Sequence, residues 1–353
     1  MGNLNLDLRL EKVESSRLTN SKYLFDCFVN QLHAILQFHN IKDTDKFIKS
    51  IVNDLNIKII FDDDNIVNYI ASHKVPLNSD VIIFGKHEDK YDDRLLLIED
   101  LLENGKSLII NPDCRFIKFS RYYQENFDLN LRENFHKFTI LCMDNKYYYY
   151  YDNPVHFNPE YHLQYKIFKS IGYVSKAELD KALSKSLKLD IITVAFDFKE
   201  DSINKNAVDC LKSYAKSFFN HTGNNQGDSL ETIYGKEAIN KLIMLCDLDT
   251  KQQYKLISPR AKGDLFWQLS NLVRKREIAL YWLENSEYNF TSNKEKVIES
   301  IKKSAELWQH FANTILRNIF SNRTLFETKQ KEYLIEILKE EEKLCYYLDY
   351  LVL

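Results

Sequence analysis

The hydrophobic positions in the first 200 residues change period several times, as they do in domains that mix helices with strands. Leucines alternate with polar residues over 4–10, and this period of two predicts a strand. Over 23–36 the apolar residues return every three or four positions, which predicts a buried helix. Further helices are expected at 43–55, near 66–70 and at 93–103, and further strands at 57–61, 81–84, 107–110, 138–142, 147–151 and 188–196.

Beyond about residue 202 the helical period continues almost to the last residue. The 220–235 segment is polar and contains glycine, so we expect a loop there. Long helices are expected at 236–246, 265–284, 293–320 and 328–351. The change in period predicts two domains of the α+β class as a whole, a mixed domain over residues 1–200 and an all-helical domain over residues 201–353.

Composition and charge narrow the class of protein. Apolar residues make up 44% of the 353 residues and charged residues 28%, as in ordinary globular proteins. The net charge of −3 gives no electrostatic basis for binding nucleic acid or an anionic membrane. No apolar run reaches the ~18 residues that a membrane span needs, and the first residues lack the apolar core of a signal peptide. We therefore expect a cytoplasmic protein that binds neither nucleic acid nor membrane.

The number and spacing of the cysteines and glycines argue against disulfide, zinc and nucleotide-binding sites. The 6 cysteines are scattered, without a CxxC pair or the spacing of a metal site, which argues against a disulfide framework and against structural zinc. Only 8 glycines are present and none forms a phosphate-binding loop, which weakens an interpretation as a nucleotide-binding protein. The sequence therefore predicts no metal and no bound cofactor.

Cys27 lies where the buried helix should begin, and Asp26 precedes it as a candidate N-cap. At a helix start, unpaired N–H groups and the positive end of the helix dipole stabilise a thiolate, which is the reactive form of cysteine. The alternative is that Cys27 is a small core residue that packs and never reacts. A base close to the thiol would favour the reactive interpretation.

His136 and Asp152 flank the β-hairpin that is predicted from the strands at 138–142 and 147–151. With a three-residue loop at 143–145, counting outward along the two strands places His136 directly opposite Asp152. A two-residue loop would place Asn153 opposite His136 instead, and both Asp and Asn can orient a histidine that activates a thiol. His156, four residues after Asp152, is a rival base.

The order of a cysteine at a helix start, a histidine opening a hairpin strand and an acid ending the next strand resembles the papain-like fold, and within it the bacteriocin-processing cysteine peptidases. Residues 101–113 and His136–Ile140 resemble the acyltransferase family of butirosin biosynthesis. In the helical half, Gly235–Ala238 and Arg274–Ala279 resemble that family too. The layout, size and Lys-, Asn- and Ile-rich composition are also similar to those of cysteine-protease homologues that form amides in closthioamide biosynthesis.

These resemblances imply a papain-like domain with an antiparallel sheet and an N-terminal cysteine helix, followed by a helical domain. They imply an acyltransferase of nonribosomal antibiotic biosynthesis, in which Cys27 attacks the thioester of an acyl or peptidyl carrier protein. His136 would move the protons, and Asp152 would orient His136. The acyl group would then pass from the acyl-cysteine to a small amine, for example a diamine such as 1,3-diaminopropane. The phosphopantetheine of this reaction belongs to the carrier protein.

The chain departs from the papain-like pattern ahead of the cysteine. Papain-like enzymes place a glutamine six residues before the cysteine to help hold the oxyanion, and this chain has Ser21 there with Asn20 beside it. Asn20, Ser21 and backbone N–H groups such as that of Cys27 are therefore the candidate oxyanion donors. The triad of Cys27, His136 and Asp152 also suits a cysteine peptidase or amidase that hydrolyses a peptide bond, which is the alternative function.

Overall fold

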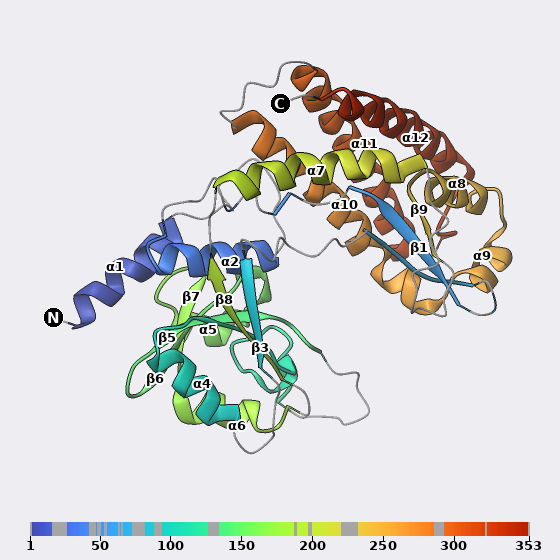
Figure 1. The fold of residues 1–353 in the computed structure, drawn as a ribbon. Helices are drawn as coiled ribbons and strands as arrows, with labels where there is room; N and C mark the ends of the chain where they lie inside the picture. The colour runs from blue at the N-terminus through green and yellow to red at the C-terminus, as the bar shows by residue number, and fades with distance from the viewer. Residues whose placement is uncertain are drawn as a thin grey trace. The chain divides into compact units, whose positions relative to one another are not determined.

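The described part of the chain forms two compact units in the computed structural model (Figure 1). The first unit draws on residues 1–22, 26–47 and 79–199, and the second on residues 23–25, 48–78 and 200–353. The structure describes residues 2–15, 27–41, 47, 51–52, 55–62, 64, 66–72, 82–87, 94–125, 134–186, 189–196, 200–219, 232–285, 293–321 and 323–351.

An antiparallel sheet of six strands forms the centre of the first unit, in the order β3-β8-β4-β5-β6-β7. The sequence predicts all of these strands except β7, which contains Gly172. A Cβ at Gly172 would collide with the Tyr150 hydroxyl of the neighbouring strand, so the close approach of the two strands requires glycine there. The strands are β3 (Ile82–His87), β4 (Leu108–Asn111), β5 (Phe138–Met143), β6 (Tyr147–Tyr151), β7 (Ile171–Ser175) and β8 (Asp190–Phe196).

Helices cover both faces of this sheet because alternate strand residues are apolar on both sides. On one face, Tyr148 and Tyr150 belong to a hydrophobic cluster that also contains Leu102 of α4 and Leu183 of α6. Tyr151 points into the other, on the side of α1 and α2. The helices are α1 (Gly2–Ser15), α2 (Cys27–Phe38), α4 (Arg94–Glu103), α5 (Pro159–Tyr165) and α6 (Lys176–Leu183).

The N-terminus corrects one prediction, because residues 4–10 belong to α1 and not to a strand. Leu6, Leu10 and Val13 follow the helical spacing and pack in the cluster shared with α2. Arg9 donates a hydrogen bond from Nε to the carbonyl of Phe38 at 2.9 Å. Leucines at every second position fit the alternation of a strand, but those four residues apart also lie on one face of a helix. Packing against α2 favours the helix.

The second unit is mainly helical but contains a sheet of three strands in the order β2-β1-β9. β1 (Ile57–Phe61) is a predicted strand, whereas β2 (Val67–Ser72) lies where we expect a helix. The N–H of Ile66 donates to the Asp62 side chain, and this turn directs β2 back along β1. β9 (Thr232–Tyr234) then pairs with the other edge of β1, so the helical half is not all-helical.

The remaining helices confirm the predominantly helical character of the C-terminal region and the α+β class of the whole chain. Residues 48–78, which the sequence assigns to the first domain, belong to the second unit because β1 pairs with β9. The helix predicted at 43–55 lies largely outside the described residues. These helices are α7 (Glu200–Phe219), α8 (Gly235–Leu245), α9 (Thr250–Leu256), α10 (Pro259–Asn285), α11 (Lys294–Phe320) and α12 (Thr328–Asp349).

None of the helices in the described residues combines the length and the apolarity that crossing a membrane requires.

Candidate active site

His136 and Asp152 form a hydrogen-bonded pair at one end of the β5–β6 hairpin. His136 Nε2 lies 2.6 Å from Asp152 Oδ2. The Asp152 side chain is 4% exposed and that of His136 is 12% exposed, so the carboxylate is closed off while the imidazole retains an accessible edge. Because Nε2 meets the carboxylate, Nδ1 is the nitrogen left to exchange a proton with a nucleophile.

The two residues meet through a hairpin register that differs from the predicted one. Thr139 lies opposite Tyr151, so continuing this register places Asp152 opposite Phe138 and diagonal to His136. At this end of the hairpin the predicted register is therefore wrong by two residues, whereas on the turn side of the bulge, where Cys142 pairs with Tyr149, it is wrong by three. A shift of two keeps every side chain on its own face of the sheet, so the contact between His136 and Asp152 is preserved.

The turn and a bulge account for this register. The Asp144 side chain accepts hydrogen bonds from the N–H groups of Lys146 and Tyr147, each at 2.7 Å, and closes the turn. An irregularity at Leu141 then adds one residue to β5, between the pairs of Ile140 and Cys142. Neither feature follows from the alternation of apolar and polar residues.

Asp152, and not Asn153, is the partner of the histidine. Asn153 accepts a hydrogen bond from the Val155 N–H with its side chain and so caps the short helix at Pro154–His156. The Asn153 N–H donates to Asp152 Oδ1 at 2.7 Å. Burial raises the pKa of the Asp152 carboxyl, and the hydrogen bonds from His136 and Asn153 act in the opposite direction.

Hydrogen bonds with Asp113 and Cys114 hold the backbone of the segment that contains His136. The Cys114 N–H donates to the carbonyl of Asn134 at 2.9 Å, and the Asn134 N–H donates to Asp113 Oδ1 at 3.3 Å. The Cys114 thiol lies 3.5 Å from the carbonyl oxygen of His136. These contacts fix the segment that leads into β5, and with it the position of the imidazole.

Cys27 is the first residue of α2, and the first turn of that helix adjoins the segment that carries His136. Lys137 Nζ lies 4.9 Å from the centre of the Phe28 ring. One turn further along α2, the Gln31 amide donates to the carbonyl of Lys137. The residues after Cys27 and after His136 are thus in contact. The side chain of Cys27 lies outside the described part of the structure, as do Asn20, Ser21 and Asp26.

Gln31 is a candidate site residue that the sequence analysis missed. Its side chain is buried, and its Oε1 has no hydrogen-bond partner among the described residues. It follows Cys27 by four residues, a spacing that places two side chains on one face of a helix. That spacing is the signal that could have identified Gln31.

The ring of His156, the rival base, lies beside that of His136 and is tilted from it by 36°. The two ring centroids are 4.1 Å apart, and Tyr122 lies 6.1 Å from His136 and 6.3 Å from His156. These aromatic rings form one wall beside the imidazole. The carboxylate that orients a base is bonded to His136, which therefore remains the better placed of the two histidines.

The other cysteines whose thiols are characterised are poor nucleophiles. Cys114 is fully buried, and burial raises its pKa to about 12. Burial also raises the pKa of Cys142 and Cys246 to about 12 each, and that of Cys345 further. These thiols stay protonated at neutral pH, and only a thiolate attacks efficiently. The described cysteines other than Cys27 have free thiols.

Within the described residues, no three His, Cys, Asp or Glu side chains are grouped so that they could hold a metal ion. Comparison of the chain with protein-family models and with curated proteins found no match.

Proposed function

We propose that the protein is a cysteine-dependent acyltransferase with a papain-like catalytic unit, which forms an amide from a carrier-bound thioester and an amine. The observation that carries the proposal is the hydrogen bond between His136 and Asp152 beside the first turn of α2, where Cys27 stands. A thiol at a helix start, a partly accessible imidazole and a buried carboxylate are the three groups that covalent acyl transfer needs.

The first half-reaction moves the acyl group onto the enzyme. His136 accepts the thiol proton of Cys27, and the thiolate attacks the thioester carbonyl. The bond from the acyl carbon to the carrier's phosphopantetheine sulfur breaks, and His136 returns the proton to that leaving thiol. Asp152 holds the imidazole in one orientation and stabilises its cationic form. Exchange of one thioester for another is nearly thermoneutral.

The second half-reaction forms the amide. An amine attacks the acyl-cysteine, His136 takes the proton that the nitrogen loses, and Cys27 leaves as a thiol on receiving it. The backbone N–H groups at the start of α2, with Asn20 or Ser21 as candidate side-chain donors, would hold the oxyanion in both steps. Partners of this reaction are an acyl or peptidyl carrier protein and a small amine, and its place is the cytoplasm, where carrier-bound intermediates are made.

Intact-protein mass spectrometry tests the proposal. After incubation with an acyl thioester, the wild-type protein should gain the mass of one acyl group, Cys27→Ala should gain none, and Cys142→Ala should gain the same mass as wild type. Acylation of Cys27→Ala to the wild-type extent would contradict the proposal.

Added amine then separates a transferase from a peptidase, because both use an acyl-cysteine. Water is present at ~55 M, so a millimolar amine forms the product only if the enzyme positions it and excludes water. We expect 1,3-diaminopropane to divert product from acid to amide while donor consumption stays the same. Formation of acid alone at every amine concentration, together with peptide cleavage, would assign the protein to the peptidases.

A further inference from the structure

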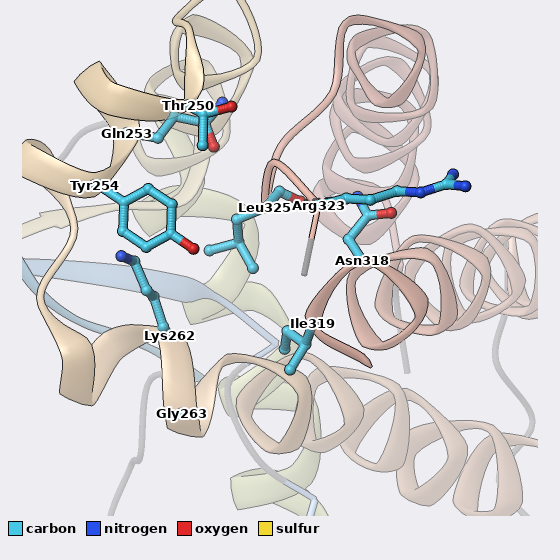
Figure 2. Close-up of a pocket in the computed structure, with 9 residues that line it drawn as sticks. All are labelled: Thr250, Gln253, Tyr254, Lys262, Gly263, Asn318, Ile319, Arg323 and Leu325. Atoms are coloured by element: carbon cyan, nitrogen blue, oxygen red, sulfur yellow. Dashed lines mark hydrogen bonds between the residues drawn. The ribbon is translucent and has the colours of Figure 1, made fainter. Parts of the chain in front are cut away.

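The second unit contains a pocket of about 220 Å³ between α9, the start of α10 and the segment after α11 (Figure 2). This volume lies below the ~300–1,000 Å³ of sites for drug-sized ligands, so an occupant would be a small molecule. The lining residues are Thr250, Gln253, Tyr254, Lys262, Gly263, Asn318, Ile319, Arg323 and Leu325.

Hydrogen bonds hold the walls of this pocket in place. The Gln253 amide donates to the carbonyls of Leu245, Leu248 and Phe326 at 2.6–3.0 Å, and its oxygen accepts from the Phe326 N–H. The Asn318 amide donates to the carbonyl of Leu325 at 3.1 Å. Two polar side chains are thus used to fix the walls, and the pocket is formed before a ligand arrives.

Two charged residues line the pocket, Lys262 and Arg323, and Lys262 is the one whose ammonium lies beside the Tyr254 ring. Its Nζ lies 3.4 Å from the centre of the Tyr254 ring, and among the described residues it has no carboxylate partner. Figure 2 shows Arg323 extending away from Lys262. No Asp or Glu lines the pocket, and the first turn of α10, which carries Lys262, holds no acidic residue. Burial lowers the pKa of Lys262, which is the direction expected for an ammonium without a counter-ion.

The opposite wall is apolar. Ile319 and the buried Leu325 face Lys262 and Tyr254 across the pocket, as Figure 2 shows. An aromatic ring and two branched aliphatic side chains suit a short hydrocarbon body. A single ammonium suits one anionic group, whereas a phosphate dianion would require more donors.

We propose that this pocket binds a small organic carboxylate, with the carboxylate on Lys262 Nζ and the apolar body between Tyr254, Ile319 and Leu325. The site belongs wholly to the second unit and does not depend on the acyltransferase proposal. It would give the protein a second ligand, chemically distinct from an amine acceptor.

Methyl NMR of the full-length protein with hexanoate as the probe tests this site. Hexanoate should shift the methyl signals of Ile319 and Leu325 and saturate in the low millimolar range, which corresponds to about −4 kcal/mol. Hexan-1-ol and hexylammonium have the same body without the negative charge, and they should bind at least about tenfold more weakly, the value of one charge-assisted hydrogen bond. Equal shifts with all three probes, or none with hexanoate up to about 20 mM, would overturn the proposal.

Substitutions test which positive charge binds the carboxylate of hexanoate. Lys262→Met should weaken hexanoate at least about tenfold. Lys255→Met, which removes a nearby charge outside the pocket, should change the affinity less than about twofold, as screened surface charges do. An affinity of Lys262→Met equal to that of wild type would contradict the assignment of Lys262.

Discussion

Each unit contains a buried carboxylate with a basic partner, and the two pairs are built differently. In the second unit, Glu341 Oε1 accepts from Arg276 at 2.5 Å, from Ser304 at 2.6 Å and from Trp308 at 2.7 Å, while Tyr214 donates to Oε2. These donors come from α7, α10 and α11 and meet Glu341 on α12. Arg276 and Glu341 are each 1% exposed.

In the first unit, Asp152 accepts hydrogen bonds from the His136 imidazole and from the Asn153 N–H. The imidazole is partly accessible and lies beside the start of α2, and an imidazole, unlike a guanidinium, can both accept and donate a proton. The saturated pair joins four helices and suits a structural role. The pair with an accessible imidazole suits proton transfer, which is why our proposal places the chemistry in the first unit.

Asp152→Asn should have the largest effect on activity. The amide keeps the shape of the carboxylate but cannot stabilise the imidazolium, so we expect amide formation to fall by about 10³–10⁴. Denaturant unfolding should change by less than about 1 kcal/mol, because burial already raises the pKa of Asp152 and its charge contributes little to stability. Activity within about threefold of wild type would remove Asp152 from the mechanism.

Glu341→Gln is the matched change in the other unit, with the opposite expectation. It leaves the Arg276 guanidinium buried without a counter-charge, so the free energy of unfolding of the second unit should fall by about 3–5 kcal/mol. Activity per folded molecule should be unchanged. Urea unfolding followed by circular dichroism measures the first quantity, and a loss of activity without a loss of stability would reverse the assignment of roles.

His33 should make the first unit sensitive to acid. Burial lowers its pKa from 6.5 to about 4, so between these values the unfolded chain binds a proton that the folded chain does not. Stability should therefore fall as the pH drops through that window, by roughly 3 kcal/mol in total. His33→Gln should lose most of this dependence in urea titrations at pH 7 and pH 4, and an unchanged slope would rule out His33 as its source.

Gln31→Leu should have the smallest effect, and it tests how α2 is aligned with the histidine. Loss of the hydrogen bond to the Lys137 carbonyl should reduce kcat by about tenfold with little change in KM, since it alters position and not binding. Gln37→Leu removes a buried glutamine from the same helix and should leave kcat nearly unchanged. Equal losses in the two variants would indicate a general effect on α2.

The sequence predicts the parts of this molecule that depend on local period. The hairpin, the buried helix after Cys27 and the long C-terminal helices all follow from repeated apolar positions. The contact between His136 and Asp152 was also predictable, because a register error of two residues keeps both side chains on one face.

Features that depend on distant partners were not predictable in this way. The alternating leucines of α1 become helical through packing on α2, and residues 67–72 become a strand through pairing with β1. The bulge at Leu141 and the hydrogen bond from Gln31 to Lys137 arise only when separate segments meet. The period of apolar residues describes one segment at a time, so contacts between distant segments become visible only in the folded structure.

The central claim is that Cys27, His136 and Asp152 act as one unit, and the pH dependence of Cys27 alkylation tests it most directly. Iodoacetamide reacts with thiolate, and peptide mass mapping reports Cys27 separately from thiols such as Cys114, whose pKa is raised to about 12. Wild-type Cys27 should react with an apparent pKa well below the ordinary ~8.5, and His136→Ala should raise this apparent pKa towards ~8.5. The same profile in both proteins would contradict the account.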